Sequence, residues 1–342
     1  MCVFTMSYIG DMPQQAENCG FKGPRAHKYC RFCFAGAKGD ITSTAEPENR
    51  LNFDIVAHGR YHFQTRQMQR AMSEMPTQEA RDDFGTQWGI NNPEPALVTI
   101  SPAADLVLTR PPDPAHSEYA GMTKMMHLFL RDVVMTVSAR DEYANMLRRW
   151  PFPRGASRLM SPLHHLNSYN LSSHARWSMI VPTLLRHWLE ARHIQPGLLA
   201  ELTRHGDDPV DVVVGAYAAL AKSNSVLMGR KLSELDRHDM DQIIRSAREK
   251  FRVLCVCAAT ASSRAGSTAR EPLGLGEGGE SSQVASGETR PAVVPFISKA
   301  GMELISDTLR PNFHIASHYP RIAKMYAIPK NLNTLAGESY HG

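Results

Sequence analysis

Apolar residues recur at three- and four-residue intervals along four long stretches of this chain, and this periodicity restricts the fold more than any other feature. The stretches cover residues 122–149, 173–192, 209–227 and 232–257. This spacing places the apolar side chains on one face of an α-helix, and that face must be buried against other elements. We therefore expect residues 34–257 to form a large α-helical region.

The composition is that of a chain with a folded core. Of 342 residues, 42% are apolar and 21% are charged, which excludes wholesale disorder. No apolar run approaches the roughly 20 residues of a membrane helix, so no membrane partner is expected. There is no GxGxxG after a strand and no GxxxxGKS/T, so we expect no nucleotide cofactor. The net charge of +4 favours anionic partners only mildly.

Composition also divides the chain into segments. The β-branched and aromatic residues of 2–10 predict a buried strand that ends at Asp11, within a first segment 1–33. Residues 258–295 are dominated by Ala, Ser, Gly, Thr and Glu, a composition that cannot offset the entropy of ordering, so a disordered loop is expected. Order is expected to return over 296–342, beginning with another helix.

Two pairs of residues have the spacing of metal ligands. Cys30 and Cys33 form a Cys-x2-Cys pair, which suits two thiolates on one tetrahedral ion. His314 and His318 are four residues apart, so on a helix both imidazoles lie on one face. Together they would complete a Cys2His2 zinc site if the fold brings together positions 281 residues apart (314 − 33 = 281). The alternatives are two partly buried thiols and two ordinary surface histidines.

Three further residues are candidates for a catalytic site. Asp11 lies where the expected first strand ends, and ligand-binding groups often follow the C-terminal ends of strands. Asp113 and His116 lie in a proline-rich turn, where they would either approach a substrate or cap the helix that follows. None of the three identifies a function by itself.

The spacing of these motifs resembles that of CACTA-type (En/Spm-like) DNA transposases, most closely their fungal branch, and also the vertebrate antigen-receptor recombinase. In the block GDMPQQAENCGFKGPRAHKYCRFC, an Asp is followed by a hydrophobic residue and Pro, and Cys30 comes 19 residues after Asp11 (30 − 11 = 19). The His-x3-His pair is followed by Tyr-Pro, and Glu338 lies 20 residues after His318 (338 − 318 = 20). The proline-rich turn matches an Asp-x2-His element of the family.

The resemblance implies a mixed α/β fold, mostly helical, in which a partial ribonuclease-H-like core is interrupted by a large α-helical insertion. It implies that Asp11 and Glu338 are catalytic carboxylates that hold Mg²⁺ for two-metal phosphodiester cleavage and strand transfer. Asp113 and His116 would lie near this active site. The two cysteines and two histidines named above would bind a structural Zn²⁺.

The partner that the resemblance implies is DNA. The expected location is the nucleus, inferred from function alone, and homo-oligomerisation is left open. For contacts with DNA we single out four residues: Arg148, Arg149, Arg176 and Trp177. The alternative for the arginines is that they belong to solvated helix ends.

One departure from the family limits the expected activity. The family's first catalytic Asp lies upstream of the second, whereas ten residues precede Asp11 here and none of them is acidic. We therefore expect a fragment or relic of a transposase catalytic domain that does not cleave DNA alone, and whether the chain is an enzyme stays open. One alternative is a non-catalytic, zinc-stabilised DNA-binding protein derived from a transposase. Another is a zinc hydrolase in which His314, His318 and Glu338 bind one catalytic ion, which leaves both cysteines unexplained.

Overall fold

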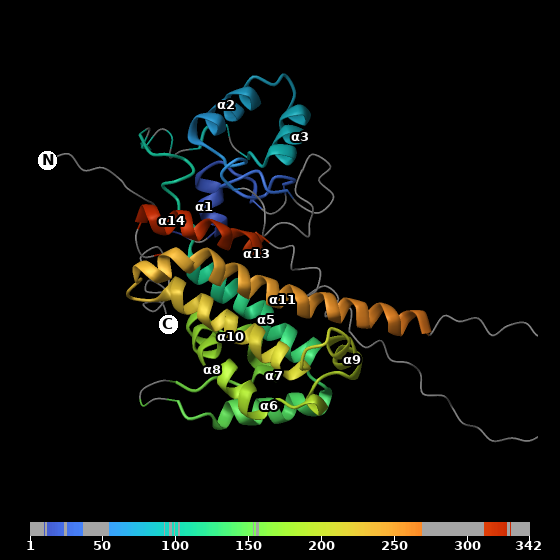
Figure 1. Cartoon of the computed structure of the whole chain (residues 1–342). Helices are drawn as coiled ribbons and strands as arrows, with labels where there is room; N and C mark the ends of the chain where they lie inside the picture. Colours follow the sequence, from blue (N-terminus) through green and yellow to red (C-terminus); the bar gives the residue numbers. More distant parts are fainter. Residues whose placement is uncertain are drawn as a thin grey trace, which may run out of the picture.

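Helices dominate the computed structural model, which describes residues 10, 12–23, 26–36, 55–91, 93–95, 98, 100–101, 103–152, 154, 157–268, 311–326 and 329. Of these described residues, 71% are helical. Figure 1 shows a smaller region built from the described residues between 12 and 91, and a larger helical unit built from the described residues between 115 and 268. The C-terminal helical segment, residues 311–326, crosses the molecule between the two.

The helical unit packs around a core of large side chains. Its elements are, in chain order, η3 (Ala115–Thr123), α5 (Lys124–Phe129), η4 (Leu130–Val134), α6 (Val137–Arg149), α7 (Pro162–His165), η5 (Leu166–Ser168), α8 (Leu171–Trp188), η6 (Ala191–His193), α9 (Pro196–Arg204), α10 (Pro209–Met228) and α11 (Glu234–Thr268). Helix α10 packs against both α8 and α11. Phe129 and Phe251 meet edge to face in this core, with ring centroids 5.1 Å apart. Burial of each such side chain contributes about 1.5–3 kcal/mol.

Three of the predicted helices begin at side-chain caps. The Thr136 hydroxyl, the Asn170 amide oxygen and the Asp208 carboxylate accept hydrogen bonds from the first turns of α6, α8 and α10, respectively. Thr136 also marks a break inside the stretch predicted as helical over 122–149. There the chain turns, because Met135 forms an antiparallel bridge with Ile194.

The long helix α11 corrects the expected start of the disordered loop. We placed that start at residue 258, but the helix continues to Thr268. Ala258 and Ala261 are buried in the helical unit, and Arg264 forms an ion pair with Glu201 of α9 at 2.6 Å. Alanine has the highest helix propensity, so an alanine-rich sequence extends a helix that neighbouring residues already anchor. The rest of the expected loop, 269–295, lies outside the described residues.

The described residues of the smaller region form three short helices and an irregular loop. They are α1 (Met12–Asn18), α2 (His62–Ser73) and α3 (Gln78–Trp88). The sequence of residues 64–75 also has a helical pattern, and α2 covers most of it. Residues 26–36 form the loop here called the cysteine loop: one isolated bridge closes it internally, from Lys28 to Gly36, and another joins it to its neighbours, from Cys33 to Gly59.

The expectation of a ribonuclease-H-like α/β core is wrong for the part of the chain that the structure describes. That part contains isolated β-bridges but no strand and no sheet. A ladder needs several consecutive paired residues, whereas the cysteine loop pairs at single positions and then bends. The strand expected over 2–10 lies outside the described residues, as does the helix expected at the start of 296–342.

The C-terminal helical segment contacts both regions. It consists of α13 (Pro311–Ile315), the 3₁₀ turn η8 (Ala316–His318) and α14 (Tyr319–Tyr326). Ile315 packs with Tyr29 and Phe32 of the cysteine loop. Tyr319 packs with Leu227 and other residues at the facing ends of α10 and α11. The segment therefore joins the cysteine loop to the helical unit.

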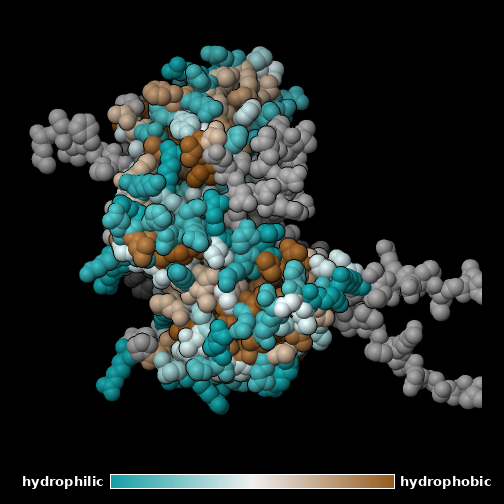
Figure 2. Space-filling view, viewed as in Figure 1, coloured by the Kyte–Doolittle hydropathy of each residue, from teal (hydrophilic) through white to brown (hydrophobic). Residues whose placement is uncertain are grey.

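The surface in view is mostly hydrophilic, with scattered hydrophobic residues (Figure 2). Among the described helices, α10 alone has the length and hydropathy of a membrane span. Half of its most apolar window is buried inside the protein, and core helices meet the same two criteria.

Candidate metal centre

Four side chains meet between the cysteine loop and the C-terminal helical segment. The ligand atoms of Cys30, Cys33, His314 and His318 all lie within 4.8 Å of one another. Cys33 Sγ lies 3.1 Å from His314 Nε2 and 3.6 Å from His318 Nε2. Cys30 Sγ lies 3.4 Å from His318 Nε2, and the two Nε2 atoms are 3.3 Å apart. The two pairs singled out in the sequence therefore converge on one point.

The nitrogen–nitrogen distance and the three sulfur–nitrogen distances given above are close to the edges of a zinc coordination tetrahedron. Zn–S bonds of about 2.3 Å and Zn–N bonds of about 2.0–2.1 Å give edges of roughly 3.3 Å between two nitrogens and roughly 3.5 Å between sulfur and nitrogen. Thiolate and imidazole ligands suit zinc, whereas Mg²⁺ prefers carboxylate and water oxygens. The four residues can therefore hold a zinc ion, and their chemistry does not suit magnesium.

The surroundings favour the metal-binding protonation state at two of the four candidate ligands, Cys30 and His318, whereas burial and the hydrogen bond with Cys30 raise the pKa of Cys33 well above its usual value. Burial opposes ionisation of Cys30, but hydrogen bonds with Cys33 and the two histidines outweigh it and lower the pKa of Cys30 well below its usual value. The backbone N–H of Phe32 also donates to Cys30 Sγ at 3.4 Å. Burial lowers the pKa of His318, which keeps its imidazole neutral. A thiolate and a neutral imidazole are the ligand forms that zinc requires.

Burial makes this a closed site. Cys30 and His318 are each 3% exposed, and Cys33 and His314 are fully buried. Four protein ligands fill a tetrahedral ion, whereas catalytic zinc keeps one position open for water or substrate. The arrangement is therefore that of a structural centre, and it argues against the zinc-hydrolase alternative.

Arg60 binds the backbone of the cysteine loop, and no sequence pattern identified it as part of the site. Its Nε donates to the carbonyl oxygens of Cys30 at 2.7 Å and Cys33 at 3.2 Å. Its Nη2 donates to the carbonyls of Lys28 at 2.9 Å and Trp88 at 2.8 Å. The side chain is 1% exposed, and burial lowers its pKa to about 10, so it stays charged near neutral pH. One guanidinium thus fixes the backbone of both cysteine ligands.

Gly89 allows this close packing. It ends α3 with φ of 75°, in the left-handed region, and a Cβ there would lie 2.3 Å from the carbonyl oxygen of Lys28. Glycine is the residue that tolerates both the conformation and the contact. The end of α3 can therefore approach the carbonyls that Arg60 binds.

We expect Arg60→Lys to lower zinc affinity by about 10- to 100-fold, the usual cost of losing a group that orients metal ligands. Lysine has a single ammonium and cannot reach the four carbonyls that the planar guanidinium contacts. Competition with a chromophoric chelator measures the change. The matched control is Arg70→Lys, at an exposed position in the last turn of α2. Equal zinc affinity in the two variants would show that Arg60 has no role in the centre.

Asp113 and His116 occupy a buried junction beside the C-terminal helical segment. The Asp113 carboxylate accepts a hydrogen bond from the Ala115 N–H at 2.8 Å, and its other oxygen lies 2.6 Å from His116 Nδ1. Asp113 is fully buried, whereas His116 is partly exposed. The carboxylate therefore caps the start of η3, which is the structural alternative that the sequence left open.

A buried ion pair extends this junction into the helical unit. Glu118 of η3 and Arg248 of α11 are both fully buried, with Arg248 Nη2 2.8 and 2.7 Å from the two carboxylate oxygens. Ser117 shares a hydrogen bond with the hydroxyl of Tyr319, the residue directly after His318. Burial, reinforced by the charge of Glu118, raises the pKa of Tyr319, so its hydroxyl stays protonated. Polar contacts thus join η3, α11 and α14 close to the metal centre.

The four residues singled out for DNA contact lie in the helical unit, away from the cysteine loop. Arg148 and Arg149 are exposed in the last turn of α6. The Arg176 guanidinium donates hydrogen bonds to the carbonyl oxygen and the hydroxyl of Ser157. Trp177 is fully buried: its ring stacks on His127 with centroids 4.0 Å apart, and its Nε1 donates to the Tyr143 hydroxyl at 2.6 Å. In this position the indole offers no face to a nucleic-acid base.

Asp11 and Glu338 both lie outside the described residues. Asp11 directly precedes Met12, the first residue of α1, and Glu338 follows the last residue of α14 by 12 positions (338 − 326 = 12). Their expected role therefore rests on the sequence motif.

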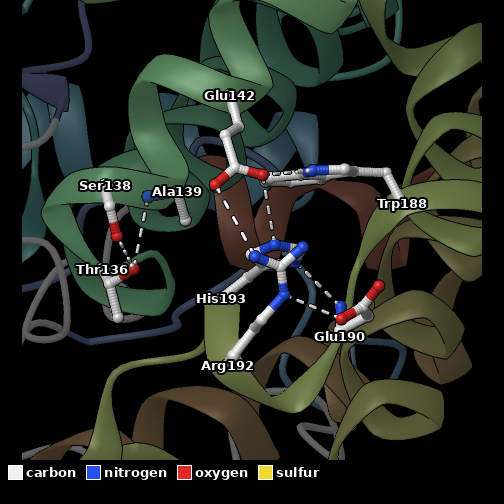
Figure 3. Close-up of polar contacts among 8 residues, drawn as sticks. All are labelled: Thr136, Ser138, Ala139, Glu142, Trp188, Glu190, Arg192 and His193. Atoms are coloured by element: carbon white, nitrogen blue, oxygen red, sulfur yellow. Dashed lines mark hydrogen bonds and ion pairs between the residues drawn. The ribbon is translucent and has the colours of Figure 1, made fainter.

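A second polar cluster, in the helical unit, has a structural explanation. Glu142 of α6 lies 3.4 Å from His193 Nε2 and 3.9 Å from Arg192, and the His193 ring stacks on Trp188 (Figure 3). The backbone N–H of Glu190 donates to His193 Nδ1, so the other ring nitrogen carries a proton toward Glu142 when the ring is neutral. These contacts fix α6 against the chain that follows α8.

Comparisons of the chain with protein-family models, with curated proteins and with solved structures find no match. The argument for function therefore depends on the metal centre and on the sequence motifs.

Proposed function

We propose that this chain is a zinc-stabilised fragment or relic of a DNA-transposase catalytic domain, in which Asp11 and Glu338 correspond to two of the catalytic carboxylates and which does not cleave DNA alone. One observation carries the proposal: a Cys-x2-Cys pair and a His-x3-His pair, 281 residues apart in sequence, form a single four-ligand cluster (314 − 33 = 281). The family motif implies that both pairs bind one ion, so they must meet in the fold. Four unrelated residues would not be expected to meet in zinc geometry.

The metal centre has a clear role in such a protein. It fastens the loop that follows α1 to the helical segment that precedes Glu338 in the sequence. Groups that act together in catalysis must be held to within about 0.5 Å, and rigid elements cross-linked by a metal provide that constraint. Bound Mg²⁺ would supply Lewis-acid activation of water and of the leaving oxygen.

The test is divalent-metal-dependent nicking of supercoiled DNA by the purified zinc-loaded chain. We expect the chain to bind DNA and to show no more nicking with Mg²⁺ or Mn²⁺ than Asp11→Ala does, because the first carboxylate that would hold the catalytic ions together with Asp11 is missing. The matched control is Asp83→Ala, an exposed carboxylate on α3. Zinc content should be the same in all three proteins, since neither aspartate belongs to the cluster.

The outcomes test both functions that remain. Nicking that needs Mg²⁺ or Mn²⁺ and is lost in Asp11→Ala would contradict the expected inactivity, and it would equally contradict a non-catalytic, zinc-stabilised DNA-binding protein. Failure to bind DNA at all would contradict both. The closed Cys2His2 cluster keeps this second candidate in view, because it needs the zinc and a DNA-binding surface but no carboxylate site.

A further inference from the structure

Two aromatic side chains are exposed next to the metal centre. Tyr61 and Phe63, at the start of α2, are 45% and 80% exposed, and Phe63 is the most exposed large hydrophobic residue that the structure describes. The Tyr61 hydroxyl donates to the carbonyl of Val56, itself 64% exposed. Single exposed apolar residues are ordinary, but an aromatic pair within three positions marks a surface suited to binding.

A basic side chain from α14 adjoins the Tyr61 ring. The Arg321 guanidinium lies 5.9 Å from the centre of the Tyr61 ring. Lys324 is exposed one turn further along the same helix and therefore lies on the same face. We refer to Tyr61, Phe63, Arg321 and Lys324 as the aromatic–basic patch.

The charged side chains of the two helices that carry the patch are all basic. Helix α2 carries Arg66 and Arg70 and no acidic residue, and α14 carries Arg321 and Lys324 and no acidic residue. The carboxylate of Asp105, in the turn that contacts His62, accepts hydrogen bonds from two backbone N–H groups. The patch therefore combines aromatic rings with positive charges. This combination is complementary to a polyanion whose planar groups can stack on the rings.

We propose that the aromatic–basic patch binds unpaired nucleotides of DNA, with bases stacked on Tyr61 and Phe63 and phosphates at Arg321 and Lys324. A ring can stack on a base only when that face of the base is free, which favours single-stranded over duplex DNA. The inference rests on the proposed function, because it names the DNA surface of that protein.

The metal centre assembles this patch. Tyr61 directly follows Arg60, which fixes the cysteine loop, and Arg321 lies three residues after His318. The aromatic half and the basic half come from parts of the chain about 260 residues apart (321 − 61 = 260), and the zinc ligands join those parts. Binding of single-stranded DNA should therefore require bound zinc.

Fluorescence anisotropy with a labelled 20-nucleotide thymidine strand and a duplex of equal length tests the proposal on the full zinc-loaded chain. We expect Tyr61→Leu with Phe63→Leu to weaken single-strand binding by about 5- to 30-fold, since leucine keeps the apolar surface and removes stacking. Arg321→Gln with Lys324→Gln should lower the slope of log affinity against log salt by about 1.4, from two lost phosphate contacts.

The control is Arg186→Gln with Arg192→Gln, which removes two exposed positive charges of the helical unit and should leave single-strand affinity unchanged. If both patch variants bind single-stranded DNA as tightly as the wild type does, this inference is wrong and the proposed function is unaffected. Absence of DNA binding in the wild type would remove both. Tighter binding of a polyglutamate peptide than of DNA, lost in the same variants, would assign the patch to an acidic protein partner and contradict the nucleotide proposal.

Discussion

Replacing Cys33 with serine is expected to reduce bound zinc from about one ion per chain to a small fraction and to lower the unfolding temperature by roughly 10 °C. Cys33 Sγ is fully buried and lies within 3.6 Å of both histidine nitrogens, so the neutral hydroxyl that replaces it is a poor fourth ligand. The cysteine loop contains no strand, and it therefore depends on the ion to hold the C-terminal helical segment. Elemental analysis after gel filtration and thermal unfolding followed by circular dichroism measure the two effects.

Cys257→Ser is the matched control for this change. Cys257 is as buried as the zinc ligands but lies on α11, in the core of the helical unit. It should lose some stability from the buried hydroxyl and keep its zinc. Full zinc occupancy in Cys33→Ser, or equal zinc loss in both variants, would be incompatible with the proposed ligand set.

The second large effect concerns the buried pair of Glu118 and Arg248. Glu118→Gln removes the negative charge and leaves a fully buried guanidinium uncompensated, which should lower the free energy of unfolding by about 3–5 kcal/mol. Replacing both residues, as Glu118→Leu with Arg248→Met, should restore most of that loss, because no charge is then buried. Urea unfolding of the single and double variants measures the difference.

An exposed ion pair provides the control for this cycle. Arg186 and Asp211 lie at a similar distance, 2.8 Å, but both side chains are about two-thirds exposed. Arg186→Gln should therefore cost less than about 1 kcal/mol. Zinc content should stay unchanged throughout, since none of these residues is a ligand. A double variant no more stable than Glu118→Gln would show that the cost arises from lost packing rather than from the unpaired charge.

The sequence predicted the helical unit because its signals are local. Apolar periodicity located the helices, and caps such as Asn170 and Asp208 mark where two of them begin. The end of α11 was missed because the sequence past residue 258 reads as low complexity, whereas tertiary contacts of Ala258 and Arg264 hold it helical.

The metal ligands were predictable for a different reason. Cysteine and histidine at fixed short spacings carry chemical meaning, so each pair was visible, although their meeting depended on the whole fold. Arg60 could not be found in this way, because its role consists of four contacts to backbone carbonyls that no residue pattern encodes. Trp177 is the opposite case, because the sequence suggested a surface role for a residue that is buried. An aromatic residue beside an arginine suggests a nucleic-acid surface, yet the hydrophobic effect placed the indole in the core.

X-ray absorption at the zinc edge of the purified chain tests the central claim most directly. If Cys30, Cys33, His314 and His318 bind one ion, the spectrum will fit two sulfur neighbours at about 2.3 Å and two nitrogen neighbours at about 2.0–2.1 Å. A shell of nitrogen and oxygen alone, or a protein that contains no zinc after expression in zinc-supplemented medium, would contradict the proposed centre.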